Sequence, residues 1–309
     1  MGIVVIGAAF VDIKGFPDDV YLPTGRNVGR VEYLHGGVSR NVVEDIANME
    51  LRPTYVGIVD DTPMGTDVLR KLNAHKVNTD YVLTRPDGMG VWLAVFDSTG
   101  DVAGSISKRP DLMPLLDLLE EKGDEIIGNA DSVVFEVDIN KEIVKKIFEL
   151  AEKHQKKTYA LVSNMSIAVE RRDFLRNLDC FICNQQEAGQ LFLDDYTGKT
   201  PEEMRAILAD KVNRAEIPSM VVTMGACGAV YADCSGYSGC CPARNVVVKD
   251  TTGAGDAFCA GVVASLTYGK MLSEAVEVGS TLAASVITSM ENVCPRFQPA
   301  EFGLNYQEE

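Results

Sequence analysis

Long apolar runs are missing from this chain. A helix that crosses a membrane needs roughly 18 or more consecutive apolar residues, and no stretch of the 309 residues reaches that length. Bases are also scarce, since 29 Lys and Arg against 45 Asp and Glu give a net charge of −16. Because no apolar run is long enough, we expect no membrane as a partner. Because the negative charge repels a polyanion, we expect no nucleic acid either.

Two common nucleotide-binding motifs are absent as well. The chain has no G-x-x-x-x-G-K-[S/T] phosphate loop, and no G-x-G-x-x-G follows its first apolar run, 3–6. The first absence excludes a P-loop enzyme, and the second disfavours a dinucleotide-binding fold. No basic segment precedes the 3–6 run, so we interpret it as a core strand rather than as part of a signal peptide.

The eight cysteines show no disulfide framework. Cys180 and Cys183 form a C-x-x-C pair, but they lie in an apolar run, and no second pair follows at the spacing of a zinc site. We interpret them as buried thiols, and we expect the reducing cytoplasm as the compartment.

Short apolar runs alternate with amphipathic helical patterns along most of the chain. In the segment 38–49, for example, Val42, Val43, Ile46 and Met49 recur at helical spacing. The alternation predicts an α/β fold with a doubly wound, mostly parallel sheet flanked by helices, in which ligands bind beyond the carboxyl ends of the strands. The predicted strands are 3–6, 54–58, 132–137, 158–162, 180–183 and 220–223, and the predicted helices include 38–49, 63–73, 141–154, 201–213 and 257–268.

Two segments depart from this alternation. Residues 12–36 are rich in Gly, Pro and charge, and residues 90–106 alternate in polarity up to a turn at 98–101. Both are typical of antiparallel ribbons that project from an α/β body, and a ribbon near the exit of the first strand could cover a substrate. A plain surface excursion is the alternative. We treat residues 1–309 as one domain that carries both insertions.

Residues 250–256, Asp-Thr-Thr-Gly-Ala-Gly-Asp, are the most informative segment. They lie between an apolar run at 245–249, interpreted as a strand, and the helix predicted at 257–268. Gly253 and Gly255 permit a tight turn, and the amides and dipole of the next helix favour an anion such as phosphate. A carboxylate beside that anion, Asp256, is explained if it takes the proton of a hydroxyl that attacks a phosphoryl group. A turn with an acidic helix cap is the alternative.

This loop, with Ala260-Gly261 after it, resembles the signature of the ribokinase-like (PfkB) sugar and nucleoside kinases. Weaker motifs extend the likeness over nearly the whole chain. The resemblance implies a ribokinase-like fold and a kinase that uses ATP and Mg²⁺. It also implies that Asp256 is the catalytic base and that the anion hole consists of the amides of Gly253, Ala254 and Gly255.

The acceptor-side motifs follow in the order of that family. The segment Gly36-Gly37-Val-Ser-Arg-Asn41 resembles the amino-terminal signature, which implies that Gly36, Gly37 and Asn41 contact the acceptor. Asp12 matches the acid that binds sugar hydroxyls, a task that suits the strong hydrogen bonds of a carboxylate. Taken alone, the same residues also fit a helix-entry turn capped by Ser39 and a solvated loop acid.

The nucleotide-side motifs are Asn184-Gln-Gln-Glu187, which fits the family's N-x-x-E element, and a T-x-G-x-x-G element that begins at Thr223. The resemblance implies that Glu187 helps to hold Mg²⁺ through water, which suits an ion that keeps most of its hydration. An ordinary helix cap at 184–187 is the alternative. The resemblance further implies a possible K⁺ site at Asp250 and ATP contacts from Asn184, Thr223, Gly225, Gly228 and Thr252.

Fewer residues indicate which acceptor is phosphorylated. Family members that bind phosphorylated sugars, and ribokinases, usually carry Lys directly after the paired glycines, where this chain has Val38. The Gly-Gly-Val-x-Arg-Asn pattern followed by Glu44 instead resembles pseudouridine kinases, as does a segment that begins at Asp138, a further candidate acceptor contact. We interpret Lys108 and Arg109 as exposed loop cations, with contact to a ligand anion as the alternative.

The sequence therefore predicts a kinase that phosphorylates a primary hydroxyl on a sugar or ribose-like acceptor, with a pseudouridine- or nucleoside-type acceptor preferred. A broader sugar kinase acting on ribose or fructose is one alternative. A regulator that binds nucleotide or sugar without catalysis is another. The resemblance also implies that the two ribbons together form a small β-lid over the acceptor and that this lid joins two subunits in a homodimer.

Overall fold

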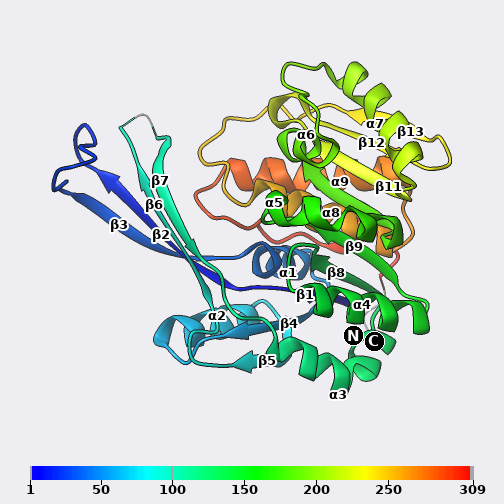
Figure 1. Ribbon diagram of the computed structural model, residues 1–309, viewed down its shortest axis with the longest axis horizontal. Coiled ribbons are helices and arrows are strands. Elements are labelled where there is room, and N and C mark those ends of the chain that lie inside the picture. Colours follow the sequence, from blue (N-terminus) through cyan, green and yellow to red (C-terminus); the bar gives the residue numbers. More distant parts are fainter. Residues whose placement is uncertain (1, 99, 307–309) are drawn as a thin grey trace.

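A computed structural model describes residues 2–98 and 100–306. The larger of its two sheets has nine strands in the order β13-β12-β11-β10-β9-β8-β1-β4-β5 (Figure 1). The strands from β11 to β5 are parallel, and β12 and β13 add an antiparallel edge. All six predicted strands are confirmed to within one residue at each end. The strands are β1 Ile3–Ile6, β4 Thr54–Val59, β5 Asn78–Thr84, β8 Ser132–Glu136, β9 Lys157–Leu161, β10 Cys180–Asn184, β11 Ser219–Thr223, β12 Ala229–Asp233 and β13 Ser238–Cys241.

Helices cover both faces of this sheet. The side chains of β1 alternate between two cores: Val4 and Ile6 face one, and Ile3 and Val5 face the other. The first core includes residues of α3 to α7, and the second includes residues of α1, α2, α8 and α9. The predicted doubly wound α/β architecture is therefore confirmed. The helices are α1 Val38–Asn48, α2 Pro63–Ala74, α3 Pro114–Gly128, α4 Lys141–Lys153, α5 Met165–Ala168, α6 Gln185–Phe192, α7 Pro201–Ala215, α8 Ala254–Thr267 and α9 Leu272–Ile287.

The chain reverses its direction of travel across the sheet at β1. It proceeds from β1 to β4 and β5 on one side, and then returns to place β8 on the other side of β1. Helices that follow neighbouring strands diverge at such a point and leave a crevice at the carboxyl ends of the strands. The first residues after β1 and the carboxyl end of β8 lie at this position.

A second sheet has four strands in the order β3-β2-β6-β7 and extends away from the body (Figure 1). Its strands are β2 Phe10–Pro17, β3 Gly29–Gly36, β6 Gly90–Phe96 and β7 Val102–Lys108. Both predicted antiparallel ribbons are confirmed, although the first begins at Phe10, two residues before the predicted start. The ribbons also join each other, because β2 and β6 pair in parallel. The predicted turn at 98–101 includes Thr99, which lies outside the described residues.

Two predictions around the 250–256 loop need correction. Residues 245–249 do not form a strand, and Val247 and Val248 are 83% and 56% exposed. This apolar run has no neighbouring strand to pair with, and its described backbone contact is a single bond from Lys249 N to Ile287 O at 2.8 Å. Helix α8 starts at Ala254, three residues before the predicted start, because Gly253 takes a positive φ of 80° and forms the N-cap.

Candidate active site

The site is organised around the first turn of α8. Gly253 caps this helix in a left-handed conformation, and a Cβ there would lie 2.0 Å from Asn292 O, so only glycine fits. Gly255 follows with open space where a Cβ would be, and its amide has no backbone acceptor among the described residues. Ala254 differs from its neighbours, since its N–H donates to Thr251 O at 3.2 Å. The helix start thus presents an accessible amide and the positive end of the dipole.

Asp256 lies in this first turn, partly buried, and accepts a hydrogen bond of 2.6 Å from Asn41 Nδ2. Burial raises the pKa of Asp256 to about 7, with further increases from Glu136 and Asp12, while Asn41 and Arg40 oppose the shift. A carboxyl group with that pKa can exchange a proton near neutral pH. The structure thus joins two predicted site residues that are 215 positions apart in the chain.

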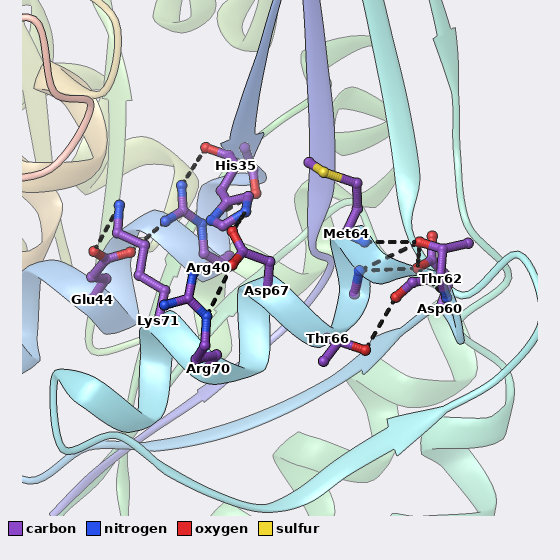
Figure 2. Close-up of polar contacts among 12 residues, drawn as sticks. His35, Arg40, Glu44, Asp60, Thr62, Met64, Thr66, Asp67, Arg70 and Lys71 are labelled. Atoms are coloured by element: carbon purple, nitrogen blue, oxygen red, sulfur yellow. Dashed lines mark hydrogen bonds and ion pairs between the residues drawn. The ribbon is translucent and has the colours of Figure 1, made fainter.

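Asn41 is itself held by a buried ionic network. Figure 2 shows the part of this network that links the second sheet to α1 and α2 through His35, Arg40, Glu44 and Lys71. Arg40 donates to Asn41 Oδ1, to Glu44 and to the carbonyl of His35 at the end of β3. Lys71 of α2 lies 3.2 Å from the same Glu44 carboxylate. Arg40 and Glu44 are almost fully buried, so the Asn41 amide has little freedom to turn. The network fixes the position of the Asp256 partner.

Asp12 and the paired glycines lie together at the base of the second sheet. Asp12 is on β2 opposite Leu34 of β3, and a Cβ on Gly36 would lie 2.3 Å from its Oδ1. Gly37 is the N-cap of α1 with φ of 96°, and a Cβ there would lie 2.6 Å from Ala8 O. Burial raises the pKa of Asp12, and the charges of Lys14 and Arg40 oppose the rise. Ser39 makes no side-chain cap of α1, so the predicted alternative of a Ser39 cap is wrong.

Lys14, which sequence analysis did not select, connects the second sheet to the loop before α8. It extends from β2, is 4% exposed, and donates from Nζ to Thr252 Oγ1 at 3.2 Å. Thr252 in turn donates its hydroxyl and its amide to Asp250 Oδ1, both at 2.9 Å. Burial alone would raise the pKa of Asp250, but these two bonds and the charge of Lys14 hold it below its ordinary value. The only sequence signal for Lys14 is its alternation with Asp12 along one strand.

Glu136 and Asn292 are two further residues that sequence analysis missed. The buried Glu136, at the end of β8, accepts from the amides of Ala8 at 3.2 Å and Ser39 at 3.3 Å, and thereby ties α1 to the end of β1. An acid inside the apolar run 132–137 was its signal. Asn292 donates to His35 O at 2.7 Å and to Asn41 Oδ1 at 3.3 Å. No sequence pattern marked it.

Asp138 lies just after β8 and bonds to Ser163 and Arg109. Its side chain is fully buried, with bonds from the Ser163 amide at 2.9 Å, the Ser163 hydroxyl at 2.7 Å and Arg109 at 3.0 Å. The interpretation of Asp138 as an acceptor contact stays a prediction, and these bonds hold its carboxylate in place. Arg109 is an anchored cation rather than a free one, although 36% of its side chain is exposed. Lys108 is exposed, as predicted, and pairs with Asp87 at 2.8 Å.

The nucleotide-side residues follow β10 and β11. Asn184 and Glu187 form a reciprocal capping box at the start of α6, with bonds of 2.7 and 2.8 Å, and their roles toward ATP and Mg²⁺ stay predictions. Burial, followed by the charge of Asp138, raises the pKa of Glu187, while its bond from the Asn184 amide opposes the rise. Thr223 ends β11, and Gly225 opens the turn that follows it. Gly228 has a positive φ of 95°, and a Cβ there would lie 2.0 Å from Cys241 O.

The donor set allows only a loosely held metal. Within residues 2–98 and 100–306, no group of three His, Cys, Asp or Glu is placed to hold a metal ion. Glu187 uses Oε2 in the capping box, which leaves its other carboxylate oxygen for a hydrated cation. Because Mg²⁺ in proteins commonly keeps several waters and takes one or two carboxylates, this arrangement fits Mg²⁺ held through water.

The eight cysteines are free thiols, with Cys180 and Cys183 buried as predicted. Across the described residues, no helix is both long and apolar enough to span a membrane.

Comparison with known proteins agrees with this geometry. The model of the pfkB family of carbohydrate kinases matches residues 2–293. The guanosine-inosine kinase of Exiguobacterium acetylicum is 34% identical over 295 residues, covering 94% of this chain and 95% of the relative. The pseudouridine kinase of Escherichia coli (strain K12) is 26% identical over 278 residues, covering 89% and 86%.

Solved structures agree as well. The ribokinase of Arabidopsis thaliana, in complex with ribose and ATP, superposes with a TM-score of 0.81 at 20% identity and covers 99% of both chains. The ribokinase of Giardia lamblia has the same TM-score at 17% identity, with 95% and 97% covered. The likeness of these two structures to the present one concerns the fold.

An α/β body, a second sheet that extends from it, and a carboxylate in the first turn of a glycine-capped helix define a protein of the ribokinase-like fold class. Within that class, the chain belongs to the pfkB family of carbohydrate kinases.

Proposed function

We propose that this enzyme transfers the γ-phosphoryl group of ATP to a primary hydroxyl on the ribose of a nucleoside. One observation carries the proposal: Asp256 has a pKa near 7, is held by Asn41, and lies one residue after the open Gly255 amide. A base and an anion-binding donor are thus adjacent on one helix turn. In-line transfer of a phosphoryl group from one oxygen to another needs both.

In the proposed reaction, Asp256 takes the proton of the acceptor hydroxyl. The acceptor oxygen forms a bond to the γ-phosphorus while the bond from that phosphorus to the β–γ bridging oxygen breaks, and ADP leaves with the electron pair. The amides of Gly253 and Gly255, with Ala254 between them, stabilise the charge on the transferred group. Asp12, Gly37 and Asn41 orient the acceptor. Positioning and electrostatic stabilisation supply most of the rate in such reactions.

The donor is proposed to bind on the side of α6 and β11, with contacts from Asn184, Thr223, Gly225, Gly228 and Thr252. Mg²⁺, when bound there, neutralises charge on the phosphates. Asn184 and Glu187 would hold it through water, since Glu187 keeps one carboxylate oxygen outside its capping bond. Asp250 and Thr252 are the candidates for a K⁺ site. We place the reaction in the cytoplasm, which suits the free thiols.

A nucleoside acceptor is favoured by the relatives and by one feature of the second sheet. The two most similar relatives described above act, by name, on guanosine and inosine or on pseudouridine. The register of β2 and β6 pairs Asp12 with Trp92, the only tryptophan in the chain, so both lie on the same face of the sheet. A partly exposed indole next to the proposed ribose-binding acid offers a flat surface on which a base can stack.

The second sheet is proposed to act as the lid and as a dimer interface. Tyr33, Ile13, Leu93 and Ile106 form one row across its four strands, on the face opposite Asp12 and Lys14. Tyr33, Leu93 and Ile106 are 62%, 40% and 70% exposed. A contiguous exposed apolar row of this kind marks a protein interface. A second copy of the chain, which carries the same row, is the proposed occupant.

An acceptor panel tests the function. ADP release would be measured with guanosine, inosine, pseudouridine, other nucleosides, ribose, fructose and phosphorylated sugars, each against a reaction without acceptor. We expect turnover with one or more nucleosides and a change in Trp92 fluorescence when those nucleosides bind. Activity with free sugars alone would favour the broader sugar kinase. Binding without turnover would favour a regulator, and a response only to sugar phosphates would contradict the interpretation of Val38.

A further inference from the structure

We propose that Lys14 is a catalytic residue: its ammonium group, carried by the lid strand β2, contacts the phosphoryl group during transfer at the start of α8. The inference rests on the proposed function and adds to it a cation that no motif of the chain assigns. It also links the lid to the chemistry, because the cation belongs to the second sheet and the anion-binding turn opens α8 of the body.

The position of Lys14 is unusual for a lysine. Lysine side chains are almost never fully buried unless they are paired, and this one is 4% exposed. Among the described residues, no carboxylate oxygen lies within 4 Å of its ammonium group. Its described hydrogen bond goes to a neutral hydroxyl, Thr252 Oγ1, at 3.2 Å. An ammonium group has three donors, so most of its hydrogen-bonding capacity is available to an anionic ligand.

The ammonium group of Lys14 also lies next to the start of α8. Thr252 immediately precedes Gly253, the N-cap of α8, so Lys14 lies at the edge of the turn that presents the Gly255 amide. On β6, Ala94 pairs with Lys14 and is fully buried, which means that the lid is covered at this point. A positive charge screened from bulk water and adjacent to a helix start strengthens an anion site considerably.

The chemistry needs such a cation. When the acceptor oxygen bonds to phosphorus and ADP leaves, negative charge is spread over the transferred group and the leaving oxygen. The proton of the acceptor goes to Asp256, and Lys14 remains an ammonium throughout, donating hydrogen bonds to phosphoryl oxygens. Val38 stands directly after the paired glycines, so the segment 36–41 supplies no lysine to the site. Lys14 supplies that charge from another strand of the lid.

The test compares Lys14→Met with Lys108→Met. Methionine keeps the length and the apolar stem of Lys14 but removes the charge. Lys108 is a matched control, because it lies on the lid strand β7, pairs with Val91 on the face opposite Lys14, and within the described part of the chain forms one ion pair, with Asp87. We expect Lys14→Met to lower kcat about 10²–10³-fold, as removal of a transition-state donor does, with a much smaller change in KM for either substrate. Lys108→Met should keep wild-type kcat.

Two further variants separate contact with the phosphoryl group from support of the loop. Thr252→Val removes the partner of Lys14 but leaves the ammonium group, so it should cost clearly less kcat than Lys14→Met. In Lys14→Ala, added ethylammonium should restore turnover in a saturable manner, while choline at equal ionic strength should not.

Several outcomes overturn the inference while the wild-type enzyme remains an active nucleoside kinase. These are a kcat of Lys14→Met within threefold of wild type, an equal loss in Thr252→Val, no rescue by ethylammonium, or a failure of both Lys14 variants to fold, which would assign the lysine to the scaffold. Absence of nucleoside-dependent turnover in the wild-type enzyme is a different result and overturns the proposed function itself.

Discussion

Asp256 is the residue at which burial, hydrogen bonding and charge act most directly on the proposed chemistry. Its surroundings penalise the charged form, since burial and the nearby acids Glu136 and Asp12 raise its pKa. The bond from Asn41 and the charge of Arg40 prevent a still larger rise. The balance places the pKa close to the pH at which a general base works best.

Replacement of this base by its amide tests its role. Asp256→Asn keeps an oxygen that can accept from Asn41 but removes the proton acceptor, so we expect kcat to fall about 10²–10⁴-fold. The fold should survive. Between about pH 4 and 7 the folded state keeps a proton on Asp256 that the unfolded state has already lost, because folding raises this pKa. The stability that this proton contributes is therefore lost as the pH rises through about 7, where Asp256 ionises in the folded state. The melting temperature of the variant at pH 8 should therefore equal or exceed that of wild type, and near-normal turnover would contradict the assignment.

The pH dependence of turnover provides an independent test. The base works only when deprotonated, and its pKa is about 7. We expect kcat/KM to rise roughly tenfold per pH unit below that value and to level off above it. Initial rates between pH 5.5 and 8.5 with saturating ATP measure this profile. A flat profile across that range would mean that Asp256 does not take the proton.

At the scale of elements, the position of α8 depends on its close packing against α9. A Cβ on Gly261 would lie 2.8 Å from the backbone of Gly279, so the two helices approach each other through a pair of glycines. This contact fixes the position of α8 relative to α9, and with it the position of the first turn of α8, where Gly253 to Asp256 lie.

Adding one methyl group at that contact is expected to displace α8. Gly261→Ala should lower the free energy of unfolding by about 1–3 kcal/mol, the usual cost of overpacking, and should also reduce kcat because the anion-binding turn moves. Gly255→Ala is the matched control for stability, since it lies on the same helix with open space at its Cβ position. Urea unfolding of both variants measures the difference. Equal stabilities would show that the helices separate without cost.

At the scale of the whole molecule, local charge outweighs the net charge of −16. Lys14 and Arg40 are both buried near the start of α8, where the dipole adds to their effect. The distant acids are mostly exposed, and salt screens them over about 10 Å. An acidic protein can therefore hold an anionic donor.

Association through the lid is a prediction at the same scale. Ile106→Asp places a charge in the apolar row with Tyr33 and Leu93, so we expect it to convert a dimer to a monomer in sedimentation velocity measurements. Ser105→Asp is the control, because it adds the same charge to the same strand on the opposite face. A wild-type monomer, or equal association of both variants, would remove the lid from the interface.

The sequence predicted some parts of this molecule well and others poorly. Six strands of the body were predictable because each is a short, mostly apolar run that is buried on both faces, whereas β5, β12 and β13, toward the edges of the sheet, were not predicted. Residues 245–249 are equally apolar but lack a neighbouring strand, which the run itself cannot reveal. Asp138 was interpreted as an acceptor contact, and its motif could not show that its carboxylate also bonds to Ser163 and Arg109.

Taken by itself, the sequence determined the α/β alternation, the two ribbons and the glycine-rich turn with its carboxylate. These features depend on residues that are neighbours in the chain, where periodicity and turn chemistry act. Only the tertiary structure decided which groups meet: Asn41 with Asp256 across 215 positions, and Lys14 with Thr252 across 238. It also decided the pKa of Asp256, because burial and the charges of distant residues exist only once the sheets and helices have packed.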